Sequence, residues 1–102
     1  MNIRQIRDLI RLEQYRLTRH ARDECRLRQI TLDDVEEAIA NGQIVEKHLD
    51  EEGFNCFLIA GERFNGDVVH VASKIVDDIL QINTVYYPHT HLWERDSKRK
   101  KR

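Results

Sequence analysis

The sequence has few residues that would constrain it covalently or conformationally: two cysteines, one proline and four glycines among 102 residues. Cys25 and Cys56 lie far apart, and we expect both to be reduced thiols rather than a disulfide. No apolar run approaches the roughly 18 residues that a membrane-spanning helix needs. Residues 1–17 hold four arginines and no cleavable signal pattern. We therefore expect a cytoplasmic protein without membrane contact.

The composition predicts one globular domain with a modest core, because 40% of the residues are hydrophobic and 34% are charged. This domain is expected to cover residues 1–93, followed by a basic tail at 94–102. The net charge of −1 conceals a segregation: +4 in residues 1–30, −8 in 31–62 and +3 in 63–102. Such a chain can offer one surface to a polyanion and another to a basic partner, although an ordinary charged surface would give the same composition.

Apolar residues at helical spacing predict two to three helices before residue 43: residues 2–15, a segment from Thr18 or His20 to Arg28, and a segment from Thr31 to Asn41. Thr31 and Asp34 resemble a capping box at the start of the last helix. Gly42 is expected at the left-handed position that usually closes a helix.

From Gly42 onward the apolar residues alternate, which predicts four antiparallel strands within residues 43–87. The predicted fold is α+β, with the N-terminal helices on one face of a curved four-stranded antiparallel sheet. Asn65-Gly66 predicts a type I′ hairpin turn, and Asp77-Asp78 predicts a second tight turn. Counting outward from these turns places His70 opposite Gly61 and Val85.

This register predicts which side chains share a face of the sheet. Tyr86 is expected among the apolar residues that pack on the helices. His70, Lys74 and Tyr87 are expected on the other face, together with Arg63, Gln81, Asn83, Phe57, Ile59 and Val85. Because a glycine opposite His70 would leave room for a ligand, this face is the predicted binding surface. The alternative is a face half covered by the C-terminal tail, including Trp93.

A cationic run at the second helix predicts phosphate binding, because helix N-termini and arginine forks both attract phosphate oxygens. The run comprises Arg19, Arg22, Arg26 and Arg28. The alternative is a solvated helix face paired with Asp23 and Glu24. His20 lies in the first turn, where the helix dipole favours neutral imidazole and suits a general base.

Two histidines suggest metal-independent chemistry. His20 and His70 can form an acid–base pair for RNA cleavage through the 2′-hydroxyl, with arginines stabilising the phosphorane charge. Neither a metal nor a cofactor is expected. His89-x-His91 alone is a weak basis for a zinc site.

Several short motifs follow one another at defined spacing: Arg19-His20-Ala21-Arg22, then Arg26, Arg28 and Ile30, then Val35, Ala38, Ile39 and Gly42, then His70-Val71-Ala72, Thr84-Val85-Tyr86-Tyr87-Pro88 and Trp93. Over residues 18–93 this series resembles an uncharacterised bacterial family of domains of unknown function. The family usually has glycine where this chain has Gln29, and the first predicted helix lies outside the resemblance.

The resemblance implies a fold similar to RelE-type toxins and a bacterial toxin–antitoxin setting, with a small antitoxin protein as partner. The expected function is a toxin-like ribonuclease acting on RNA, and the alternative is a non-enzymatic protein-interaction module. The candidate catalytic residues are His20, His70 and Tyr86. The candidate RNA-binding residues are Arg19, Arg22, Arg26, Arg28, Lys74 and Tyr87.

Overall fold

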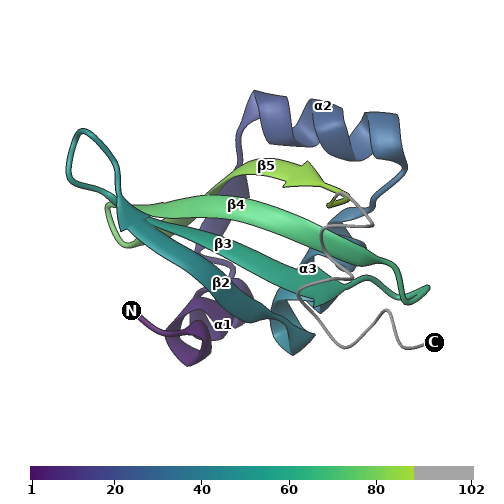
Figure 1. The fold of residues 1–102 in the computed structure, drawn as a ribbon, viewed down its shortest axis with the longest axis horizontal. Helices are drawn as coiled ribbons and strands as arrows, with labels where there is room; N and C mark the ends of the chain where they lie inside the picture. Colours follow the sequence, from purple (N-terminus) through teal and green to yellow (C-terminus); the bar gives the residue numbers. More distant parts are fainter. Residues whose placement is uncertain (89–102) are drawn as a thin grey trace.

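The computed structural model describes residues 1–88, which form three helices and five strands in an α+β arrangement. In chain order these are α1 (Ile3–Arg11), β1 (Tyr15–Leu17), α2 (Arg19–Arg28), α3 (Leu32–Asn41), β2 (Gln43–Leu49), β3 (Asn55–Glu62), β4 (Val68–Val76) and β5 (Ile79–Tyr86). Figure 1 shows α1 and α3 on one side of a twisted sheet, while α2 lies beside β5. No helix in this part of the chain is long and apolar enough to cross a membrane.

The sheet is mixed and has five strands in the order β1-β5-β4-β3-β2. Strands β2 to β5 are antiparallel neighbours, as predicted, but β1 adds a fifth strand that pairs parallel with Leu80–Ile82 of β5. The prediction of a helix up to residue 15 and a sheet of only four strands was therefore wrong. Helix α1 ends at Arg11, and Glu13 turns the chain into β1 with a φ of 59°.

Threonine side chains cap the starts of α2 and α3, and the capping box at Thr31 was predicted. The side chain of Thr18 accepts a hydrogen bond from the Ala21 amide and begins α2. Thr31 and Asp34 form a reciprocal capping box at α3. Such caps satisfy amides that have no partner within the helix.

The register at the first hairpin differs from the prediction by one residue. Of Asn65 and Gly66, only Gly66 has a positive φ, at 93°. The Arg63 amide donates to the Asp67 carbonyl, and the Gly66 amide donates to the Arg63 carbonyl. These bonds close a three-residue loop with glycine at its left-handed position, rather than the two-residue type I′ loop.

The second hairpin has the predicted turn, but a bulge changes the register beyond it. Asp77 and Asp78 have φ values of 53° and 64°, as a type I′ turn requires. Ser73 then pairs with Ile82 while Ala72 pairs with Thr84, so Asn83 is an extra residue in β5. A bulge of this kind moves the following side chains to the opposite face.

These two changes correct the predicted surroundings of His70. Its neighbours across the strands are Ala60 and Tyr86, not Gly61 and Val85. Phe57, Ile59 and Val85, predicted on the outer face, instead belong to the buried core together with Val69, Val71, Leu80 and Ile82. We call the face opposite α1 and α3 the outer face. Because strand residues alternate between faces, His70 lies on the outer face, and its neighbour Tyr86 lies there too.

Two glycines allow close packing of α3 against the sheet. A Cβ atom on Gly61 would lie 1.8 Å from the Ala38 carbonyl oxygen, and one on Gly42 would lie 2.4 Å from the same atom. Gly42 has a φ of −89°, so its predicted left-handed closing role was wrong. Gly61 therefore serves the packing of α3 and does not make room beside His70.

The left-handed helix closure occurs at Gln29, the C-cap of α2, with φ 58° and ψ 41°. The Ile30 amide donates to the Cys25 carbonyl across this turn. A side chain at such a position costs about 1–2 kcal/mol relative to glycine.

Replacing Gln29 with glycine should therefore raise the free energy of unfolding by about 1 kcal/mol. Urea denaturation would measure the change. The matched control is Gln43→Gly, at the extended start of β2, where glycine should lower stability by roughly 0.5–1 kcal/mol. An unchanged or lower stability of Gln29→Gly would contradict this account of the α2 terminus.

Candidate functional site

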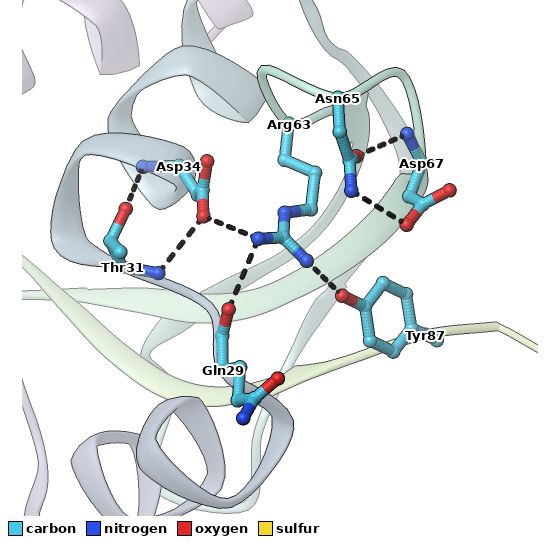
Figure 2. A network of polar contacts seen from close by, with 7 residues as sticks. All are labelled: Gln29, Thr31, Asp34, Arg63, Asn65, Asp67 and Tyr87. Atoms are coloured by element: carbon cyan, nitrogen blue, oxygen red, sulfur yellow. Dashed lines mark hydrogen bonds and ion pairs between the residues drawn. The ribbon is translucent and has the colours of Figure 1, made fainter.

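A buried ion pair between Arg63 and Asp34 lies where the end of β5 meets the β3–β4 hairpin and the α2–α3 loop. Arg63 donates to the Asp34 carboxylate at 2.9 Å and to the Gln29 carbonyl at 3.0 Å, and it also donates to the Tyr87 hydroxyl. Figure 2 shows Arg63 reaching between these groups from the base of the β3–β4 hairpin. The side chains of Arg63 and Asp34 are 16% and 7% exposed. Tyr87, a predicted RNA-binding residue, is thus tied to a structural network.

The carboxyl group of Asp34 stays ionised in this network. Burial alone would raise its pKa, but hydrogen bonds from Thr31 and Arg63 and the charge of Arg63 bring the pKa below its usual range. Arg63 thereby joins the β3–β4 hairpin to α3, while Gln29 and Tyr87 link it to α2 and the end of β5. This network positions the strand that carries Tyr86.

His70 and Tyr86 form a polar pair on the outer face. The His70 Nδ1 and Tyr86 Oη atoms are 3.2 Å apart, and the rings meet edge to face with centroids 5.3 Å apart. His70 is 9% exposed, and burial lowers its pKa although the nearby Glu46 opposes that shift. Burial and the charges of Glu46 and Glu24 raise the pKa of Tyr86. Near neutral pH the pair therefore consists of a neutral imidazole and a protonated phenol.

Helix α2 brings a second polar group to the same edge of the sheet. The Glu24 carboxylate accepts a hydrogen bond from the Val85 amide at 3.0 Å, at the part of β5 that β1 does not reach. Its other oxygen lies 3.4 Å from Nε2 of His20 and 3.7 Å from the Arg28 guanidinium. We call His20, Glu24 and Arg28 the β5 flank of α2, because residues four apart share one helix face.

The remaining arginines of α2 lie on its other side. Arg22 and Arg26 line a groove of about 720 Å³ that also contacts β1 and α3. Arg22 donates to the Leu17 carbonyl at 2.9 Å, and Arg26 pairs with Asp23 at 3.0 Å. The structure therefore divides the predicted arginine run: Arg22 and Arg26 line the groove, whereas Arg28 contacts Glu24, which is bonded to β5.

Two further predicted RNA-binding residues lie on β4 and at the start of α2. Lys74, in the interior of β4, pairs with Asp50 at 3.3 Å and lies over the Phe54 ring. Arg19 is exposed at the first turn of α2. The His89-x-His91 motif, the aromatic Trp93 and the tail at 94–102 lie outside the described residues.

The sequence prediction missed the acidic residues of this site. Glu24 was considered only as a surface partner of arginines, and Glu46 was not considered as a site residue. The spacing His20, Glu24 and Arg28 contained a usable signal, because a carboxylate four residues from each cation contacts both on a helix. The approach of Glu24 to β5 depends on tertiary packing and has no such signal. Within residues 1–88 no group of three histidine, cysteine or acidic side chains could hold a metal ion.

The lowered pKa of His70 predicts how stability depends on pH. The unfolded state binds a proton near pH 6.5, whereas the folded state resists binding it. The free energy of unfolding should therefore fall as pH decreases from about 6.5 toward the lower folded pKa of His70. Urea denaturation at pH 7 and pH 5 would measure this slope.

His70→Gln should reduce the dependence of the free energy of unfolding on pH. His48→Gln, at an exposed position of β2, should retain the pH dependence that His70 contributes. The assignment of a buried neutral imidazole would be wrong if His70→Gln had the same pH dependence as the wild type.

Comparison of the sequence with known protein families identifies the family to which this α+β domain belongs. Residues 17–87 match the family described as Domain of unknown function (DUF4258), so the chain belongs to this family. The match includes the whole of α2 and the four strands β2 to β5, whereas α1 lies outside it. No curated protein and no solved structure shows significant similarity to the chain.

Proposed function

We propose that the protein is a toxin-like ribonuclease that cleaves RNA through the 2′-hydroxyl, using side chains rather than a metal for proton transfer. One observation supports this proposal above all others. The Glu24 carboxylate lies 3.4 Å from Nε2 of His20 and accepts a hydrogen bond at 3.0 Å from the amide of Val85, the neighbour of Tyr86 in β5. His20 and the His70–Tyr86 pair, predicted from separate parts of the sequence, are thus linked through Glu24 and β5.

His20 is the proposed general base. Its side chain is 67% exposed, so an RNA strand can reach it, and Glu24 orients its ring. His20 takes the proton from the 2′-hydroxyl, and the resulting alkoxide attacks the adjacent phosphorus. The imidazolium formed in this step would be stabilised by the Glu24 carboxylate.

Tyr86 is the proposed general acid. It is partly exposed, whereas the Nε2 atom of His70 is buried. Its raised pKa keeps the phenol protonated, so it can donate to the 5′-oxygen as the phosphorus–oxygen bond breaks. The products are a 2′,3′-cyclic phosphate and a 5′-hydroxyl. His70 is the positioning residue that holds the Tyr86 hydroxyl through Nδ1.

Arginines at α2 are the proposed phosphate ligands. Arg28 lies on the β5 flank, and Arg19 is exposed at the start of the helix, so both can approach RNA bound at Tyr86. Arginine forks suit the developing phosphorane charge. Arg22, Arg26 and Lys74 would contact more distant phosphates.

The proposal includes a RelE-like architecture, a cytoplasmic location and a small antitoxin as protein partner.

The test is to purify the protein free of any partner and incubate it with total cellular RNA in the presence of a chelator. Cleavage under these conditions and growth arrest after induction in bacteria are the expected results. If the folded protein neither cleaves RNA nor arrests growth, the ribonuclease proposal is wrong.

A non-enzymatic interaction module is the second candidate function, and the exposed edge of the sheet favours it. Among residues 1–88, strand β2 has a neighbouring strand only on its β3 side, and six of its seven residues are exposed. An open edge can pair with an added strand of another protein. This candidate predicts a stable complex with a partner protein and no cleavage of RNA by the free domain.

A further inference from the structure

A groove bounded by β1, α2 and α3 contains none of the proposed catalytic residues and shares only Arg22 and Arg26 with the proposed RNA-binding residues. We call it the α2–α3 groove; its volume is about 720 Å³, within the range of small-molecule sites. Apolar side chains of Leu17, Cys25, Ile30 and Leu32 contribute to its lining. Tyr15 also lines it, on the helix-facing side of β1, whereas His70 lies on the outer face.

The two walls of this groove carry opposite charges. Arg22 and Arg26 extend from α2 on one wall, whereas Glu36 extends from α3 on the other. Arg22 donates one of the five N–H groups of its guanidinium to the Leu17 carbonyl, which holds the side chain in place. Glu36 is held by a hydrogen bond from the Tyr15 hydroxyl. Both charged groups are thus oriented before any ligand arrives.

We infer that the α2–α3 groove binds a nucleoside monophosphate whose base carries an exocyclic amine. The phosphate is the natural partner of two arginines one helical turn apart, because guanidinium forks match phosphate oxygens. The amine donates to the Glu36 carboxylate. The flat base lies against Tyr15 and the apolar lining, where aromatic stacking favours any nucleobase.

The volume of the groove and the charges of its lining favour this ligand class over smaller zwitterions. An amino acid would leave most of a groove of about 720 Å³ unfilled. A nucleotide places an aromatic body between its anionic group and its hydrogen-bond donor. Free phosphate would meet the arginines but would leave Glu36 and the apolar lining without a ligand contact.

Isothermal titration calorimetry of the full chain at low salt with GMP, AMP, CMP and UMP tests the inference. We expect saturable 1:1 binding of the three nucleotides with an exocyclic amine and weaker binding of UMP. Arg26→Gln and Glu36→Gln should each weaken the binding by about tenfold or more, because each removes a charge-assisted hydrogen bond. Arg26 is 74% exposed, and glutamine at position 36 can still accept from Tyr15, so both variants should fold.

Arg4→Gln, at an exposed position of α1 away from the groove, is the matched control and should bind like the wild type. Absence of nucleotide binding would overturn the inference, and so would equal binding of ribose 5-phosphate and GMP. Equal losses in Arg26→Gln and Arg4→Gln would also overturn it. Because none of these measurements depends on RNA cleavage, the groove and the proposed ribonuclease site can fail independently.

Discussion

Replacing Arg63 with alanine should lower the free energy of unfolding by about 3–5 kcal/mol, the usual cost of removing one partner from a buried ion pair. The substitution leaves the Asp34 carboxylate buried beside its Thr31 contacts but without its counter-charge. It also removes the hydrogen bonds that join Arg63 to Gln29 and Tyr87. Urea denaturation monitored by circular dichroism would measure the loss.

Arg11→Ala is the matched control, because Arg11 pairs with Asp8 at the surface, with side chains 68% and 51% exposed. An exposed pair of this kind contributes roughly 0–1 kcal/mol. Lysine at position 63 should not restore stability, since an ammonium group cannot reproduce the three-way contact of the planar guanidinium. If Arg63→Ala cost no more than Arg11→Ala, the network in Figure 2 would not hold this end of the sheet together.

The second large effect concerns activity and rests on the proposed function. Tyr86→Phe and His20→Gln should each reduce the rate of RNA cleavage by about 10²–10⁴-fold, the usual loss when a general acid or base is removed. Tyr86→Phe removes only the hydroxyl that meets His70 Nδ1 and preserves the ring contact. Single-turnover cleavage of a labelled RNA would measure both rates.

His48→Gln, on the exposed strand β2, is the control and should cleave RNA at the wild-type rate. Circular dichroism would establish that each variant is folded. A folded Tyr86→Phe protein with cleavage within about threefold of wild type would exclude Tyr86 as the general acid, because that change is far below the expected loss.

Much of the fold followed from local sequence patterns. The capping box at Thr31 and the turn at Asp77-Asp78 depend on contacts within a few residues, and both occur as predicted. Strands β2 to β5 also fall within the predicted segment, because the alternation of apolar residues is a strong signal.

The errors came from features that local patterns do not determine. Asn65-Gly66 suits both a two-residue and a three-residue loop, and the choice between them shifts the pairing of His70. The bulge at Asn83 then changes the face of Val85 and Tyr86. Strand β1 contains only three residues and is defined by its pairing with β5, so an alternation of apolar and polar residues could not reveal it.

The candidate site was predicted in part. The sequence singled out His20, His70 and Tyr86, and the register errors, once corrected, bring Tyr86 to the face of His70. The role of Glu24 could not be predicted, because it depends on α2 lying along the open part of β5. Helix geometry also separates Arg22 and Arg26 from Arg28, although all three look alike in a linear cationic run.

The proposed roles of His20 and Tyr86 require cleavage of RNA through its 2′-hydroxyl. The most direct measurement is mass spectrometry of the ends of RNA fragments produced by the purified protein in the presence of a chelator. We expect 2′,3′-cyclic phosphate and 5′-hydroxyl ends that appear with the wild type and are lost with Tyr86→Phe. Fragments with 5′-phosphate and 3′-hydroxyl ends, or intact RNA after incubation with the folded wild type, would contradict the proposal.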